Sequence, residues 1–149
     1  MIRKNIIIIC LYFFLTNCGF TPIYLNKTSE TFSIEEIDYT GDKELNNFLK
    51  TNLNKYKNKE VDNKIFIEAN SSYEKIILSK NEVGEVTNYQ LKVEVIFLIK
   101  PTNKKIKFNK RMIMDSMDDK FEEERYERSI KQNFAYSISN KLSSELIIN

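Results

Sequence analysis

The chain has 149 residues, with 23 Lys and Arg against 21 Asp and Glu, no histidine, three glycines and two cysteines. This near balance of charge argues against a nucleic-acid-binding protein, which normally has a basic excess. The absence of histidine removes the commonest general base and the commonest metal ligand. The length predicts one domain with a hydrophobic core.

The first 17 residues have the layout of a secretory signal peptide. Arg3 and Lys4 precede an apolar run of ten residues from Ile6 to Leu15, as in the basic and apolar regions of such a signal. A transmembrane helix needs about 20 apolar residues, so a run of this length does not predict a permanent span.

A cysteine stands where the mature chain would begin. Leu15-Thr16-Asn17-Cys18 matches the lipobox of bacterial lipoproteins at Leu15, Thr16 and Cys18, whereas Asn17 stands where Gly, Ala or Ser is usual. We therefore predict that residues 1–17 are removed and that Cys18 receives acyl chains, which would anchor the domain on a membrane surface. A plain signal peptide followed by an unmodified Cys18 is the alternative.

Removal of residues 1–17 takes away Arg3 and Lys4 and leaves 21 basic against 21 acidic residues. It also takes away Cys10, so that no disulfide is expected in the mature chain. Residues 18–31 contain Gly, Pro, Asn and Ser, which is typical of a linker. Residues 32–149 then form a single α+β domain.

The first elements of this domain are a strand and a helix. Residues 32–39 alternate as a strand if a bulge near Glu35 and Glu36 restores one face. Asp42 is placed to cap a helix over residues 43–57. The apolar stripe of this helix has the spacing expected for an α-helix and consists of Leu45, Phe48, Leu49, Leu53 and Tyr56.

Three further strands are predicted at residues 64–79, 86–100 and about 104–114. The strand over residues 86–100 has one apolar face, which consists of Tyr89, Leu91, Val93, Val95, Phe97 and Ile99. Its other face is polar, which is typical of a sheet with one face on a core and one on water. Ile96 and Leu98 interrupt the polar face and predict that this part of it is covered.

The last element is a long helix over about residues 119–147. Ser116 and Asp119 have the spacing of a capping box. The apolar stripe that follows consists of Tyr126, Ile130, Phe134, Ile138, Leu142 and Leu146. The elements together predict an α+β fold, with an antiparallel four-stranded sheet and two helices packed on one face, in the order β-α-β-β-β-α.

No catalytic residues, metal site or cofactor site are predicted. The chain has no histidine for a Ser or Cys triad and too few glycines for a phosphate-binding loop. The dense carboxylates between Asp115 and Glu124 are interpreted as the acidic first turn of a helix. An enzyme that uses carboxylates alone, with or without a hard cation, is the remaining alternative.

A basic strip is the only candidate ligand site. Lys105, Lys107 and Arg111 alternate along one face of the last predicted strand. They are interpreted either as a solvated edge that discourages aggregation or as a site for an anionic ligand, because cationic side chains bind phosphates through charge-assisted hydrogen bonds.

The start of the mature chain resembles a known family. Cys18-Gly19-Phe20-Thr21-Pro22-Ile23-Tyr24 is similar to the C-G-F-x-P-L-Y start of the short alphaproteobacterial lipopolysaccharide-assembly lipoproteins (LptE-like). The element order also looks like that family. The resemblance implies an outer-membrane lipoprotein on the periplasmic side, which plugs a large β-barrel translocon that inserts lipopolysaccharide. A free periplasmic lipoprotein that binds a soluble ligand or inhibits an enzyme is the alternative.

Overall fold

The computed structural model describes residues 32–57 and 59–147. The predictions for the signal peptide, for Cys18 and for the linker over residues 18–31 lie outside these residues. The elements in chain order are β1 (Ser33–Gly41), α2 (Lys43–Leu53), the short 3-10 helix η2 (Asn54–Tyr56), β2 (Lys64–Lys80), β3 (Val86–Lys100), β4 (Lys104–Asp115) and α3 (Lys120–Ile147).

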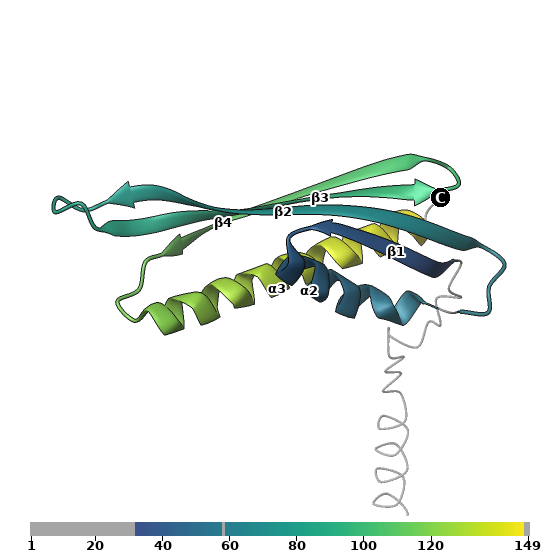
Figure 1. The fold of residues 1–149 in the computed structure, drawn as a ribbon, viewed down its shortest axis with the longest axis horizontal. Helices are drawn as coiled ribbons and strands as arrows, with labels where there is room; N and C mark the ends of the chain where they lie inside the picture. Colours follow the sequence, from purple (N-terminus) through teal and green to yellow (C-terminus); the bar gives the residue numbers. More distant parts are fainter. Residues whose placement is uncertain (1–31, 58, 148–149) are drawn as a thin grey trace, which may run out of the picture.

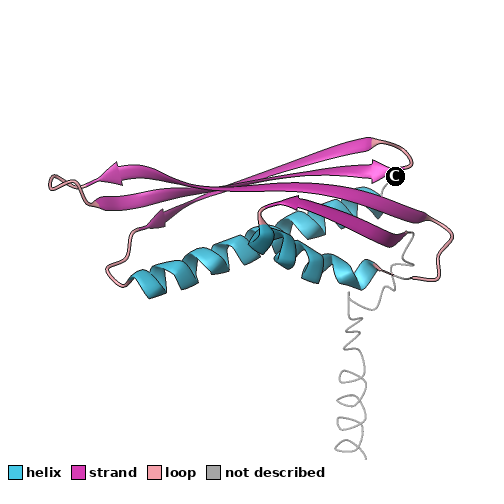
Figure 2. Cartoon of the chain, viewed as in Figure 1, coloured by secondary structure: helices cyan, strands magenta, loops and turns pink. Residues whose placement is uncertain are grey.

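The domain has two layers, a four-stranded sheet and a pair of helices that both lie against one face of it (Figures 1 and 2). The predicted α+β fold and the placement of both helices on one face are confirmed. The chain order matches the prediction, with η2 added after α2. The opposite face of the sheet, which no described element covers, is called the open face below.

The predicted antiparallel sheet is wrong for one pair of strands. The strand order is β1-β2-β3-β4, and β1 runs parallel to β2 while the other two pairs are antiparallel. In chain order α2 follows β1 and precedes β2, and it returns the chain to the end of the sheet where β1 began. Two parallel neighbours need such a crossover connection. The sheet is therefore mixed, with one parallel and two antiparallel pairs.

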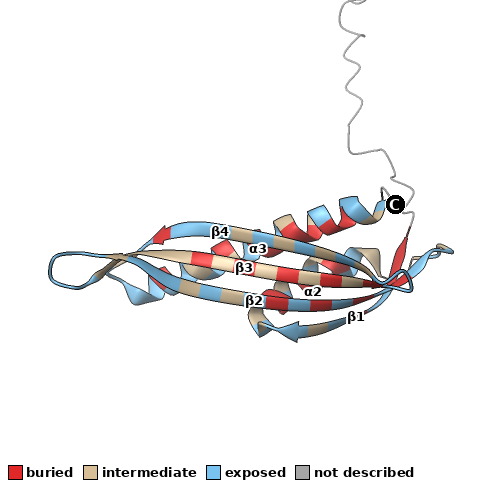
Figure 3. Ribbon diagram, turned by 90° about the horizontal axis from the view of Figure 1, so that it is seen from above, coloured by how far each residue is buried: buried red, intermediate tan, exposed pale blue. Residues whose placement is uncertain are grey.

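The core lies between the sheet and the helices. The buried side chains of β3 are Leu91, Val93, Val95, Phe97 and Ile99, and Figure 3 shows this alternation along the strand. They are the predicted apolar face. The expected bulge in β1 is present as a register shift between Ile34 and Glu36, and it keeps both Ile34 and Ile37 in the core.

The two helices begin differently from one another. The Asp42 carboxylate caps α2 as predicted, because it accepts a hydrogen bond of 2.7 Å from the Leu45 amide. The capping box expected for α3 is not formed. Since α3 begins at Lys120, Asp119 caps it instead and accepts from the Phe121 amide at 2.8 Å, while the Ser116 hydroxyl donates to Glu123.

The strands differ in length, which gives the domain two distinct ends. β1 pairs with β2 only from Lys64 to Ser71, whereas β2 and β3 continue as a long hairpin (Figure 1). We call residues 72–94 and 112–126 the distal end. It contains the β2–β3 hairpin and the connection from β4 to α3. The start of β1 and the β3–β4 turn lie at the opposite, proximal end.

Candidate functional site

The basic strip lies on the open face of β4, as its alternation predicted. Lys105, Lys107 and Arg111 pair across the ladder with Leu98, Ile96 and Lys92 of β3, and all three are exposed. They therefore point away from the helices. Ile96 and Leu98 are half-buried beside them, although no described element covers this part of the face.

Carboxylates on neighbouring strands neutralise part of this face. Lys107 Nζ lies 2.9 Å from a Glu94 oxygen, and Lys92 Nζ lies 3.1 Å from a Glu74 oxygen. Lys105 and Arg111 have no such partner in the part of the chain that the structure describes. Six residues of strand separate them by about 20 Å. Together they cannot clamp one phosphate, but they match a ligand that carries separated anionic groups.

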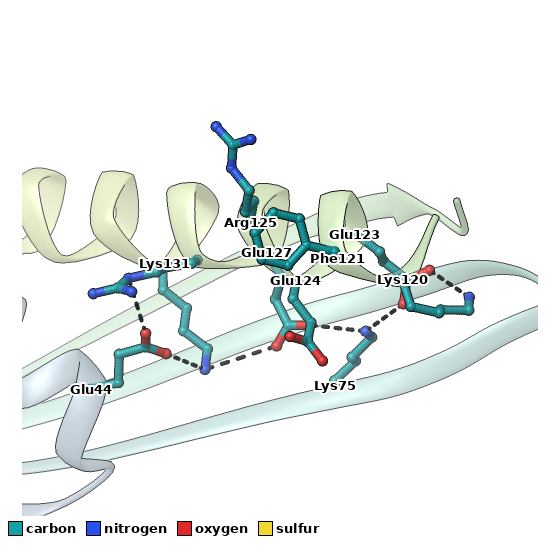
Figure 4. Close-up of a pocket in the computed structure, with 10 residues that line it drawn as sticks. Glu44, Lys75, Lys120, Phe121, Glu123, Glu124, Arg125, Glu127 and Lys131 are labelled. Carbon is teal, nitrogen blue, oxygen red and sulfur yellow. Dashed lines mark hydrogen bonds and ion pairs between the residues drawn. The ribbon is translucent and has the colours of Figure 1, made fainter. Parts of the chain in front are cut away.

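A second group of charged side chains lies on the helix side of the sheet, where sequence reasoning did not place it. A cavity of about 530 Å³ is lined by Glu44 of α2, by Lys75 of β2 and by the first part of α3. Charged side chains that line this cavity form a chain of ion pairs from α2 across to the start of α3 (Figure 4). We call this group the charged cluster, and its members are Glu44, Lys75, Lys120, Glu123, Glu127, Arg128 and Lys131.

Glu123 is the most buried member of this charged cluster, with 4% of its surface exposed. Its carboxylate lies 3.0 Å from both Lys75 Nζ and Lys120 Nζ and accepts from the Met117 amide at 3.0 Å. Burial alone would raise the pKa of Glu123, but these hydrogen bonds outweigh it and lower the pKa to about 2. Glu123 is therefore held as a carboxylate at neutral pH.

Glu127 joins the two halves of the charged cluster. It lies 2.9 Å from Lys75 and 3.8 Å from Lys131, and the Tyr73 hydroxyl donates to it at 2.7 Å. Burial opposes the charge of Glu127, but the hydrogen bonds from Lys75 and Tyr73 lower its pKa. Burial and the bond to Glu127 raise the pKa of Tyr73. The hydroxyl thus stays a donor.

Lys131 extends the cluster to the other helix. Its amine lies 2.9 Å from a Glu44 oxygen and 3.9 Å from the centre of the Tyr73 ring. Glu44 also pairs with Arg128 at 3.4 Å. Because these contacts join α2, β2 and α3, the charged cluster is suited to hold the start of α3 on the sheet. It offers no carboxylate triad to a metal ion, since no group of three potential ligands converges among the described residues.

The stripe predicted for α3 is therefore wrong in its first turns. Tyr126 was assigned to the core, but 40% of it is exposed, and Glu123 and Glu127 face the sheet instead. A signal for this was present in β2. Lys75 follows Ile67, Ala69 and Tyr73 on the core face of that strand, and a lysine there indicates an acidic side chain opposite it, without saying which one.

Neither α2 nor α3 combines the length and the apolarity that a membrane span needs, within residues 32–57 and 59–147.

The acidic residues at the start of α3 follow the expected pattern only in part. Asp119 caps the helix and Glu122 pairs with Arg125 at 3.0 Å, whereas Glu123 serves the contact with the sheet.

The fold has relatives among solved structures. It is similar to rare lipoprotein B from Shewanella oneidensis, with 20% identity and a TM-score of 0.52 over 76% of this chain and 97% of that one. An uncharacterized lipoprotein B from Nitrosomonas europaea gives 18% identity and a TM-score of 0.52, over 78% and 88% of the two chains.

A minor lipoprotein from Acinetobacter baumannii gives 13% identity and a TM-score of 0.51, over 74% of this chain and 94% of that one. No family model and no curated relative match the sequence. At these identities the comparison establishes a shared fold, which this chain has in common with bacterial lipoproteins.

Proposed function

We propose that this chain is an outer-membrane lipoprotein, anchored through Cys18 on the periplasmic side, that acts as the plug or partner of a large β-barrel translocon for lipopolysaccharide. The observation that carries the proposal is the lipobox followed by Gly19-Phe20-Thr21-Pro22-Ile23-Tyr24. The fold shared with bacterial lipoproteins supports it.

The open face is suited to burial against a partner. Phe66 is 46% exposed there, and Ile96 and Leu98 are half-buried among ion-paired lysines and glutamates. Exposed apolar side chains that are rimmed by polar and charged residues mark interaction surfaces. We assign the domain a binding role and no catalytic one, because the carboxylates at the centre of the charged cluster are already engaged by lysines.

The first test is purification of the lipidated protein from detergent-solubilised outer membranes. The intact mass is expected to correspond to residues 18–149 plus acyl chains, and a large barrel protein is expected to co-purify in equal amount. A Cys18→Ser variant should lose the acyl mass, because Cys18 carries the whole predicted lipid anchor. A lipidated chain without a barrel protein, in several detergents, would favour the free lipoprotein that binds a soluble ligand.

The second test concerns the basic strip. Reversal of Lys105, Lys107 and Arg111 to Glu is expected to weaken lipopolysaccharide binding at least tenfold, because repulsion replaces the attraction to the phosphates of lipid A. The thermal midpoint should change little, since among the described residues the only ion pair lost is the one between Lys107 and Glu94, and an exposed pair contributes about 0–1 kcal/mol.

A matched control reverses Lys43, Lys50 and Lys141, which are exposed on the helices. It changes the net charge by the same amount away from the open face. Binding to immobilised lipopolysaccharide should then be close to that of the unmodified protein. If both triple variants lost lipopolysaccharide binding equally, the loss would be due to net charge and not to a site at the basic strip.

A further inference from the structure

Exposed apolar side chains gather at the distal end. Among the described residues, most of the large apolar side chains with an exposed surface lie there, and only Phe66, Tyr136 and Ile147 lie elsewhere. Ile76, Ile77 and Leu78 are consecutive in β2, and because strand side chains alternate they emerge on both faces of the hairpin. A gathering of exposed apolar side chains of this kind marks an interaction surface.

The hairpin is built to present its tip. The Asn81 side chain accepts from the Val83 and Glu85 amides at 3.1 and 2.8 Å, and its amide group donates to Glu85 at 2.9 Å. Val83 stands at this ordered turn with 79% of its surface exposed. An apolar side chain held out by a fixed turn loses little conformational entropy when it binds.

The distal part of β2 has one unpaired edge. Beyond Ser71 no described strand lies on the β1 side, so residues 72–80 are paired only with β3. Figure 1 shows β1 ending well before the hairpin does. Insertion of this edge into lipid would bury unpaired N–H and C=O groups, which costs several kcal/mol for each group. An extended segment of a protein can satisfy them instead.

The charge of the distal end points the same way. With the buried and ion-paired Glu123 set aside, the distal end contains nine Asp or Glu against five Lys or Arg. Glu82 and Glu85 of this acidic excess lie at the hairpin turn. Anionic lipid headgroups are repelled by such a surface, and so is the same end of a second copy. A protein surface that carries basic side chains is attracted.

From these observations we propose that the distal end docks into an apolar groove of a partner protein that has a basic rim, and that an extended segment of that partner pairs with β2 beyond Ser71. Resting on the proposed function, this assigns the distal end, rather than the basic strip, as the contact with the wall of the translocon. The two surfaces then have different tasks, one toward the protein and one toward the anionic ligand.

The test uses the full lipidated chain in cells, with the photocrosslinker benzoylphenylalanine at Val83. The crosslinked species is identified by mass spectrometry in three backgrounds, unmodified, Leu78→Asp and Ile147→Asp. Leu78 and Ile147 make a matched pair, because both are aliphatic and they are 47% and 42% exposed, but Ile147 lies in α3 outside the distal end and the open face. The thermal midpoint of each variant is measured in parallel.

The expected result is a crosslink from Val83 to one identified protein, reduced at least tenfold by Leu78→Asp and kept by Ile147→Asp, with similar midpoints. Crosslinks to lipid, to a second copy or to nothing overturn the inference, and so does equal loss in both variants. If that identified protein is not a barrel, the proposed function fails while the docking surface stands. If a barrel protein co-purifies but Val83 does not crosslink to it, the docking surface is wrong while the proposed function stands.

Discussion

Gly41→Ala is expected to remove a large part of the stability of the domain. Gly41 ends β1 with φ +93°, and an added Cβ would lie 1.8 Å from the Ser71 carbonyl oxygen. That oxygen belongs to the backbone of β2 and cannot rotate away. Its position is also fixed by a hydrogen bond of 3.1 Å from the Asp42 amide.

The cost of this substitution exceeds that of a strained φ alone. The clash would separate β1 from β2 where Asp42 caps α2, so three elements would lose their mutual placement. We expect a loss of more than about 4 kcal/mol, a large part of the stability of a domain of this size. The measurement is urea unfolding followed by far-ultraviolet circular dichroism.

Gly84→Ala is the matched control. Gly84 has a similar φ of +88°, but an added Cβ would meet nothing within 4 Å. The expected loss is about 1–2 kcal/mol, the cost of a left-handed conformation for a residue with a side chain. If both substitutions had the same effect, β1 and β2 would not approach each other at Gly41 as the structure describes.

Glu123→Gln is expected to destabilise the domain by about 3 kcal/mol at pH 7. This is the low end of the cost of removing one member of a buried ion pair. The low end applies because Lys75 keeps its second partner, Glu127. The start of α3 should loosen first, since Glu123 joins it to β2, and amide hydrogen exchange over residues 120–127 is expected to report this.

The effect of Glu123→Gln should depend on pH. The pKa of Glu123 is about 2 in the folded chain, below its ordinary value of 4.5. Its contribution is therefore fully present above pH 4.5 and is lost as the pH falls toward 2. The difference in the free energy of unfolding between the two proteins should shrink over that interval. A difference that is the same at pH 7 and pH 3 would assign the loss to packing rather than to charge.

Glu124→Gln provides the control for this substitution. Glu124 is the next residue in α3 and is exposed, so the same chemical change there is expected to alter the free energy of unfolding by no more than about 0.5 kcal/mol. The control separates the charged cluster from the general effect of removing one carboxylate near the start of a helix.

Local patterns predicted the elements well where apolar residues recur at every second position, as in a strand, or at every third or fourth position, as in a helix. The bounds of β3 agree with the prediction because Leu91 to Ile99 alternate without interruption. The cap of α2 was also predictable, since Asp42 and the Leu45 amide are three residues apart. The α3 stripe was predicted correctly from Ile130 onward and failed at Tyr126.

The failure at Tyr126 has a physical cause. An apolar stripe predicts a helix face only where the facing surface is apolar too. The surface opposite the first turns of α3 contains Lys75, and its ion pair with Glu123 joins residues 48 positions apart in the chain. No local spacing contains that pairing, because it depends on the register of β2 and on the placement of α3.

The sequence by itself determined which side chains share a face in β3, α2 and most of α3, where α2 is capped, and the lipobox on which the anchor prediction rests. These depend on neighbours within a few residues. Only the tertiary structure decided that β1 is parallel to β2, that Glu123 and Glu127 meet Lys75, and that β2 has an unpaired edge beyond Ser71. Each of these depends on where α2 returns the chain and on the register of strands that are distant in sequence.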